Sequence, residues 1–404
     1  MRPHVVSRRG LLLTGGALVA WGYLPNAAMA AAGRDPRFVF INLRGALDGL
    51  AAVAPVGDPD YERVRSGLVL PTSGANPAYK LNDFFVLHPA MKTFADLYSK
   101  GEALVVHAVA SPYRERSHFD GQDVLEAGLG GVGKSATGWL NRATALIPKG
   151  ERIDPVEGLS VGAAVPLVMR GPAPVVTWLP QGFPPATDDT RNRLAEIYAH
   201  VDPELARRFD EALKVEHAAM ADPTAKPGAK RPDAGSFREA GLAAGRLLAR
   251  ADGPRLGSMS FLGWDTHADE KPLDGQLNRL LGALDAAIDG LRSELAGAWK
   301  DTVVVVATEF GRTARMNGTL GTDHGTATIA LLVGGAVKGG RVIADWPGLT
   351  DAKLYQNRDL APTNDVRAVF KGILRDHIGL DEKLLASEVF PASAQIKPLG
   401  GLVA

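Results

Sequence analysis

The fold is decided by residues 302–308, which read Thr302-Val303-Val304-Val305-Val306-Ala307-Thr308. Four consecutive valines flanked by threonine favour an extended backbone, because β-branched side chains pack well on a pleated surface. A run that is apolar on both of its alternating faces is typical of a strand buried on both sides of a parallel sheet. This segment therefore predicts a central strand with helices packed on either face.

The segment before it, residues 274–299, is the strongest predicted helix. Its large apolar residues recur at helical spacing: Leu277, Leu280, Leu281, Leu284, Ile288, Leu291 and Leu295. Apolar runs at 37–43, 103–109, 174–179, 255–262 and 329–333 predict further strands, and residues 87–100, 117–129, 188–220, 235–251 and 363–374 predict helices. This alternation predicts an α/β fold with a central, mostly parallel sheet covered by helices on both faces. A single domain is expected over residues 31–404, with a helical insertion at 188–252 that contains a flexible Pro/Lys-rich loop at 222–233.

Composition excludes several classes of protein. The 404 residues include no cysteine, which excludes disulfides, thiolate metal sites, Fe–S clusters and a cysteine nucleophile. Lys+Arg and Asp+Glu both number 45, so no basic excess is present to neutralise phosphates. We therefore expect no binding to nucleic acid.

The first thirty residues have the features of an export signal. Arg8-Arg9 precede a mildly apolar stretch at 11–24, and Ala28-Met29-Ala30 has the pattern of a cleavage site. Paired arginines in this position resemble a twin-arginine (Tat) signal. The alternative is a transmembrane anchor, but the apolar stretch is short for a bilayer that needs about 20 residues. The sequence predicts periplasmic or extracellular location through Tat export, with the Tat translocase as a transient partner and no stable membrane span in the mature protein.

Candidate site residues follow the predicted strands, where ligands bind in open parallel sheets. Asp265 and His267 come after the strand at 255–262. In an extended backbone residues two apart point the same way, so a carboxylate and an imidazole there can bind one cation such as Zn²⁺ or Mn²⁺. The alternative is a hydrogen-bonded pair that braces a loop.

Three further candidate metal ligands lie in similar loops. In the Asp323-His324 pair adjacent side chains diverge, so His324 is the expected ligand and Asp323 its supporting partner. Glu309 ends the central strand, where a carboxylate is costly unless it is bound to a metal or paired, for example with Arg312. Asp48 lies in a glycine-flanked turn, and a simple Asx turn is the alternative there.

Ser117 is the candidate nucleophile. It is expected at a helix N-terminus, where backbone N–H groups favour an oxyanion or phosphate, and a hydroxyl beside a metal can attack an ester. Arg116 and Arg312 are expected to hold the anion. The alternative is that Ser117 simply caps the helix.

The ordered motifs resemble a known family. They are RGALDGL (44–50), SHFDGQD (117–123), GWDTH (263–267), ATEFGRT (307–313) and GTDHG (321–325). Behind a Tat signal, this set is similar to a bacterial exported family, a domain of unknown function related to the alkaline phosphatase and sulfatase superfamily. The resemblance covers about residues 36–380 and implies a phosphatase-like α/β fold with two metal sites. In that comparison Asp265, His267 and His324 resemble one site, and Asp48, Ser117 and Glu309 resemble the other.

Two positions depart from the superfamily pattern. Glu309-Phe310 stands where the superfamily usually has Asp-His, so one imidazole ligand is missing, and Asp265 is closer than usual to His267. The resemblance implies an exported, metal-dependent hydrolase that acts on a small anionic ester of phosphate or sulfate. The alternative is a non-catalytic periplasmic binding or assembly protein on the same fold. Phe310 and the charged region at 188–235 favour that alternative.

Overall fold

The structure is a computed structural model that describes residues 34–147, 158–162, 164–178, 207 and 234–404. The predicted signal at 1–30 and the predicted loop at 222–233 lie outside the described residues. The same holds for the predicted helix at 188–220, apart from residue 207. Among the described residues, no helix combines the length and the apolar character needed to cross a bilayer.

A mostly parallel sheet forms the centre of the molecule, as the sequence predicts. Its strands are β1 (Arg37–Arg44), β5 (Ala103–Ala110), β6 (Gly158–Val161), β7 (Val175–Trp178), β8 (Leu256–Leu262), β9 (Thr302–Ala307), β10 (Thr328–Val333), β11 (Arg341–Ile343) and β12 (Asn364–Asp365). The order across the sheet is β11-β5-β10-β9-β1-β8-β6-β7, and β12 pairs with β5. Only β10 runs against its neighbours, because it is antiparallel to both β5 and β9.

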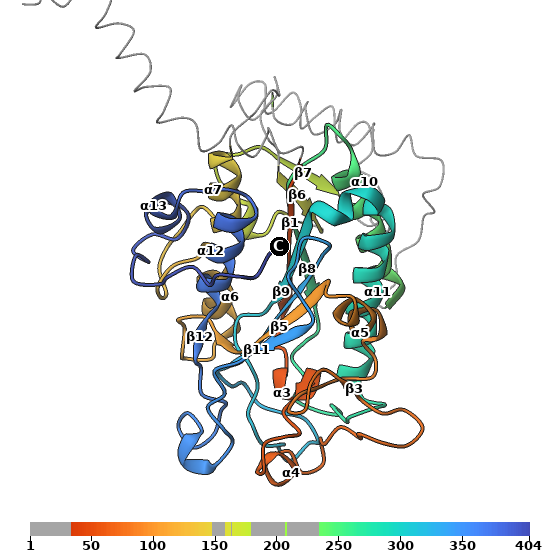
Figure 1. The fold of residues 1–404 in the computed structure, drawn as a ribbon. Coiled ribbons are helices and arrows are strands. Elements are labelled where there is room, and N and C mark those ends of the chain that lie inside the picture. Colours follow the sequence, from red (N-terminus) through yellow and green to blue (C-terminus); the bar gives the residue numbers. More distant parts are fainter. Residues whose placement is uncertain (1–33, 148–157, 163, 179–206, 208–233) are drawn as a thin grey trace, which may run out of the picture.

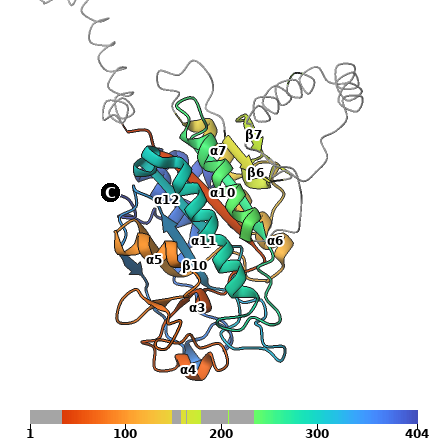
Figure 2. The same cartoon turned by 90° about the vertical axis from the view of Figure 1, so that its right-hand side faces the viewer.

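Helices cover both faces of this sheet (Figures 1 and 2). One face carries α5 (Lys92–Ser99), α10 (Ala234–Ala249) and α11 (Gln276–Leu295), and the other carries α6 (His118–Ala127), α7 (Trp139–Leu146) and α12 (Val366–Asp376). Alternate residues of the central strands enter the two cores. In β9, Val304 and Val306 face the α11 side, whereas Val303 and Val305 face the α12 side. The valine run is therefore buried on both faces, as its pattern predicts.

Smaller elements complete the chain. They are α3 (Gly49–Ala52), β2 (Val53–Ala54), α4 (Tyr61–Val64), β3 (Tyr79–Lys80), β4 (Val86–Leu87) and α13 (Glu382–Leu384). The strands β2, β4 and β3 form a second, three-stranded sheet. In Figure 1 this small sheet and α4 lie at the end of the molecule where β1 finishes.

Two helix boundaries differ from the sequence prediction. The helix expected at 274–299 ends at Leu295, because Ala296 has a positive φ of 46° and the chain continues as a 3₁₀ helix over Ala296–Asp301. The stretch expected to be helical from residue 87 first completes β4 and becomes helical only at Lys92. In the C-terminal part of the predicted insertion, α10 packs on α11 and contributes Phe237 and Leu248 to the core beneath it.

Candidate metal centre

Three histidines and one aspartate meet at the edge of the sheet where β8 and β9 end. His118 is the first residue of α6, and Asp265 and His267 follow β8. His324 lies between β9 and β10. Because β10 is antiparallel to β9, its first residues lie at the edge where β9 finishes. Segments far apart in the sequence are thereby brought together at this edge.

The ligand atoms of Asp265 and His324 lie close to those of the two other histidines. Asp265 Oδ1 lies 3.4 Å from His118 Nε2, 3.0 Å from His267 Nε2 and 3.2 Å from His324 Nε2. His324 Nε2 lies 3.0 Å from the Nε2 atoms of both His118 and His267. Tetrahedral ligands at the usual Zn–N distance of about 2.0–2.1 Å are separated by about 3.3 Å, so separations of this size suit a bound cation.

Hydrogen bonds to the other ring nitrogen fix the tautomer of two histidines. His118 Nδ1 lies 2.8 Å from Glu309 Oε1, and His324 Nδ1 lies 2.9 Å from the backbone oxygen of Arg116. Both partners can only accept, so each Nδ1 carries a hydrogen and the neutral ring presents a bare lone pair at Nε2. Metal-binding histidines are held by partners of this kind.

His267 is oriented in the same way by Asp323, whose Oδ1 lies 3.3 Å from His267 Nδ1. Asn317 Nδ2 donates to this Oδ1 at 3.0 Å and also to the backbone oxygen of His267 at 2.9 Å. Asp265 Oδ1 and His324 Nε2 are therefore each close to the Nε2 atoms of the two other histidines, and the ligand atoms of His118, Asp265 and His324 all lie within 4.8 Å of one another. Such a set is stabilised by a shared positive charge, and imidazole with carboxylate suits Zn²⁺.

The ionisation of the centre favours a cation as well. Burial alone raises the pKa of Asp265, but the hydrogen bond from Arg312 Nη1, 2.6 Å from Oδ1, together with the charges of Arg312, His267 and His118, outweighs burial and lowers that pKa. Burial lowers the pKa of His324, and the nearby His118 lowers it further. The hydrogen bond to Glu309 raises the pKa of His118, so protons compete with a metal chiefly at that ring.

Glu309 lies behind His118 and not among the converging ligand atoms. Its buried carboxylate accepts hydrogen bonds from His118, from the backbone N–H of Gly45 at 2.9 Å and from Thr308 Oγ1 at 2.6 Å. Burial would raise its pKa, but the hydrogen bonds outweigh burial and lower it. Gly45 has a φ of +124°, and a Cβ there would lie 2.5 Å from the backbone nitrogen of Asp265, so this approach requires glycine.

Phe310 also supports the histidines. It is buried, its ring stacks on His118 with centroids 5.0 Å apart, and it lies 5.4 Å from the ring of His324. The aromatic residue that departs from the superfamily pattern therefore packs against two of the converging rings.

Asp48 belongs to a separate, closed cluster. It caps α3 by accepting from Ala51 N, and its Oδ2 lies 2.6 Å from Nη2 of the fully buried Arg65. Glu270 is buried beside this pair, and desolvation together with the Asp48 charge raises its pKa to about 8. One guanidinium therefore faces two carboxyl groups, of which one holds a proton at neutral pH.

The predicted catalytic residues lie around the centre. Ser117 is the N-cap residue of α6, but its side chain makes no capping hydrogen bond, so the capping alternative is not what the structure shows. Arg116 Nη2 is bound to Asp359 Oδ2 at 2.7 Å, and the buried Arg312 is bound to Asp265. Both guanidiniums are thus engaged by carboxylates.

His118 is the member of the centre that the sequence analysis does not propose as a ligand. It lies next to Ser117 in the motif SHFDGQD, where the expected helix start favours the hydroxyl as the functional group. The sequence feature that could have indicated His118 is an imidazole at the first position of a helix that follows a strand. That combination aims the ring at the sheet edge where the other ligands lie.

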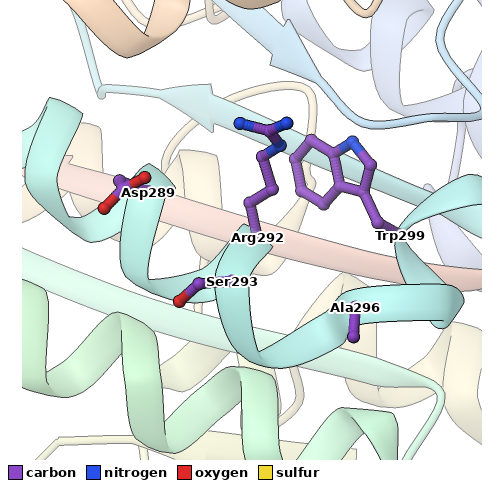
Figure 3. A pocket seen from close by; sticks show the side chains of 5 residues that line it. All are labelled: Asp289, Arg292, Ser293, Ala296 and Trp299. Atoms are coloured by element: carbon purple, nitrogen blue, oxygen red, sulfur yellow. The ribbon is translucent and has the colours of Figure 1, made fainter.

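Two other features do not contribute to the centre. Residues 128–135 read G-x-x-x-x-G-K-S, the spacing of a phosphate-binding loop, but they follow helix α6 and not a strand, so the required context is missing. The second feature is a cavity of about 280 Å³ that is lined by Asp289, Arg292, Ser293, Ala296 and Trp299 (Figure 3). Ala296 and Trp299 belong to the 3₁₀ helix directly before β9, so this cavity lies at the opposite end of that strand from the centre.

The chain belongs to the family described as "Protein of unknown function (DUF1501)", whose profile matches residues 35–389. No curated protein matches it. Among solved structures it is similar to Ps i-CgsB in complex with k-i-k-neocarrahexaose, at 10% identity and a TM-score of 0.42, over 90% of this chain and 77% of that chain.

Two further solved structures show comparable similarity. One is a protein in the alkaline phosphatase superfamily from Vibrio parahaemolyticus, at 12% identity and a TM-score of 0.34, over 74% of this chain and 60% of that chain. The other is the phosphonate monoester hydrolase of Agrobacterium radiobacter, at 11% identity and a TM-score of 0.33, over 76% and 70%.

Proposed function

We propose that the protein is an exported, single-metal hydrolase of small phosphate or sulfate esters. The observation that carries this proposal is that the ligand atoms of His118, Asp265 and His324 lie within 4.8 Å of one another, with His267 Nε2 3.0 Å from both Asp265 Oδ1 and His324 Nε2. A divalent cation bound there, Zn²⁺ or Mn²⁺, would polarise an ester oxygen. The side chains of His267 and Asp265 are 45% and 42% exposed, so a small ester can reach the centre from solvent.

Ser117, Arg116 and Arg312 have different proposed roles around this centre. Ser117 precedes His118, its hydroxyl is not used in capping, and it lies at a helix N-terminus that favours negative charge. We assign it as the nucleophile that attacks the ester. Arg116 and Arg312 act on the anion through their charge, because their guanidiniums are already bound to Asp359 and Asp265.

Metal content and turnover of the mature protein test this function. We expect the Zn²⁺- or Mn²⁺-loaded protein to hydrolyse an aryl phosphate or an aryl sulfate. Ser117→Ala should abolish turnover while most of the metal remains bound. Ser387→Ala, a distant exposed serine that bonds Lys383 O, serves as the matched control. A loaded protein whose turnover survives Ser117→Ala would exclude that nucleophile.

One observation favours the alternative function, a metal-dependent binding or assembly protein. Within the described part of the centre, both candidate anion-binding arginines are engaged by carboxylates. A protein that binds metal at this centre but hydrolyses neither aryl phosphates nor aryl sulfates would support this alternative.

Export is a separate part of the proposal and rests on Arg8-Arg9 and the Ala28-Met29-Ala30 motif. Replacing both arginines by lysine should leave the precursor unprocessed in the cytoplasm. A double variant that still reaches the periplasm with an N-terminus near Ala31 would contradict the Tat assignment.

A further inference from the structure

We propose that the alcohol part of the substrate is an apolar group that packs on Phe119 and Leu320, which lie on two of the segments that carry residues of the centre. This inference rests on the proposed function, because it names the substrate class for the same site.

Phe119 is the first observation. Its side chain is 88% exposed, although a phenylalanine is usually buried. It follows His118 directly on α6. Phe310 is buried and stacks on the His118 ring. His118 therefore has a buried aromatic residue against its ring and an exposed one next to it in the sequence. An exposed aromatic side chain beside a ligand residue is well placed to cover an apolar part of a bound molecule.

Leu320 is the second observation. It is 50% exposed and lies in the loop that holds His267. Its backbone forms a bridge with Ala268, and Thr319 Oγ1 in the same loop donates to His267 O at 2.6 Å. Leu320 and Phe119 therefore lie on two different segments that carry histidines of the centre, since His267 Nε2 and His118 Nε2 are each 3.0 Å from His324 Nε2.

A third exposed leucine lies on the strand that leads to the centre. Leu262, at the end of β8, is 62% exposed and lies beside Arg44, whose neighbour Gly45 donates to Glu309. The described residues include only two other large exposed hydrophobic side chains, Val132 and Leu384. Exposed apolar side chains are therefore concentrated on the segments that carry the ligands, which is typical of a binding surface.

The charged groups near the centre argue against a highly charged alcohol part. Lys271 is paired with Asp269 at 2.8 Å, and Arg315 is paired with Asp351 at 2.6 Å. Asp323 adds a negative charge beside His267. These groups would not attract a polyanionic chain, whereas the metal would bind a single phosphate or sulfate group and the apolar rim its alcohol.

Binding of inert analogues tests the inference. The probes are methyl-, butyl- and octylphosphonate, with the matching alkyl sulfonates, added to the Zn²⁺-loaded protein after its metal content has been measured. We expect affinity to rise about two- to fourfold for each of the first added methylenes, since each buried methylene contributes up to about that factor. Phe119→Ser and Leu320→Ser should each flatten this dependence on chain length. Val132→Ser should retain this dependence; it removes a side chain of the α6–α7 loop that is 61% exposed, between the 50% of Leu320 and the 88% of Phe119.

The outcomes separate this inference from the proposed function. A loaded protein that binds methyl and octyl analogues equally well, or binds none of them, overturns the apolar-substrate inference and leaves the metal centre in place. Chain-length dependence that survives both Phe119→Ser and Leu320→Ser overturns the assignment of these residues. A protein that takes up no metal refutes the proposed function, and the inference is refuted with it.

Discussion

The open centre of Asp265 and the three histidines and the closed cluster of Asp48, Arg65 and Glu270 are joined by a short chain of contacts. Arg312 bonds Asp265 on one side and Thr322 Oγ1 on the other, and Thr322 Oγ1 donates to Glu270 Oε2 at 2.7 Å. Both groups gather ionisable side chains, but their positive charge comes from different sources. In the closed cluster the Arg65 guanidinium provides it within the fold.

The open centre contrasts with this arrangement. Its candidate ligand atoms are three imidazole nitrogens and a carboxylate oxygen, and within the part of the chain that the structure describes the guanidinium bound to them is that of Arg312, on Asp265. Its side chains are partly exposed, whereas Asp48, Arg65 and Glu270 are at most 1% exposed. The buried carboxylates near Arg65 are therefore part of the architecture, whereas the carboxylate and imidazole groups beside solvent form a candidate ligand site. This distinction explains why Asp48 and Asp265, both aspartates after strands, have different roles.

Removing the buried positive charge of Arg65 should have the largest effect, a loss of folding stability. Arg65→Met leaves Asp48 and Glu270 buried without a counter-charge, and we expect the free energy of unfolding to fall by about 3–5 kcal/mol. Urea unfolding measures this change. The control is Arg63→Met, because the exposed guanidinium of Arg63 pairs with Asp60 and Asp351 on the surface. This substitution should leave the free energy of unfolding nearly unchanged. Equal stability of the two variants would mean that the closed cluster does not depend on Arg65.

His118→Ala should have the next largest effect, on metal binding and not on folding. The variant loses one converging Nε2 atom, so metal affinity should fall by more than about 100-fold, which exceeds the usual effect of residues behind the ligands. Competition with a chromogenic chelator measures the affinity. Asp83→Ala is the control, because Asp83 is 98% exposed and pairs only with Lys80. Unchanged affinity in His118→Ala would remove this residue from the centre.

Glu309→Gln should lower metal affinity less than His118→Ala does. A neutral amide accepts a weaker hydrogen bond from His118 Nδ1 than the carboxylate does. Metal affinity should therefore fall by about 10–100-fold. A loss as large as that of His118→Ala would instead indicate that Glu309 itself binds the metal, as the superfamily resemblance implies.

The closed cluster also predicts a dependence of stability on pH. In the fold the pKa of Glu270 is raised to about 8 by desolvation and by Asp48, so between about pH 5 and pH 8 the folded protein holds a proton that the unfolded chain has lost. The stability of the wild type should therefore decline as pH rises through this window. Glu270→Gln should reduce that decline by at least about 1 kcal/mol. Parallel stability curves for the two proteins would show that Glu270 does not titrate in this way.

Much of the fold could be predicted from sequence because its signals are local. The valine run of β9 and the spaced leucines of α11 determine buried faces without reference to distant residues. The rule that side chains meet at the carboxyl ends of parallel strands also brings Asp265, His267 and His324 to one edge. The early end of α11 could not be predicted, since it depends on the positive φ of Ala296.

The partners of individual carboxylates could not be predicted from the sequence. Asp48 pairs with Arg65, and Glu309 with His118, through the directions of side chains on separate segments. A sequence shows that a buried carboxylate needs a partner, but it does not show whether the partner is a guanidinium, an imidazole or a metal. The role of His118 could not be predicted for the same reason, because nothing in its local sequence shows that Glu309 accepts a hydrogen bond from its Nδ1.

Calorimetric titration of the metal-stripped mature protein with Zn²⁺, and in parallel with Mn²⁺, tests the central claim most directly. We predict that a single equivalent of metal binds, that affinity decreases as pH falls because the histidines must be neutral to coordinate, and that Asp265→Ala abolishes tight binding. Absence of uptake of either metal, or uptake that is unchanged in Asp265→Ala, would contradict a metal centre formed by Asp265, His118, His267 and His324.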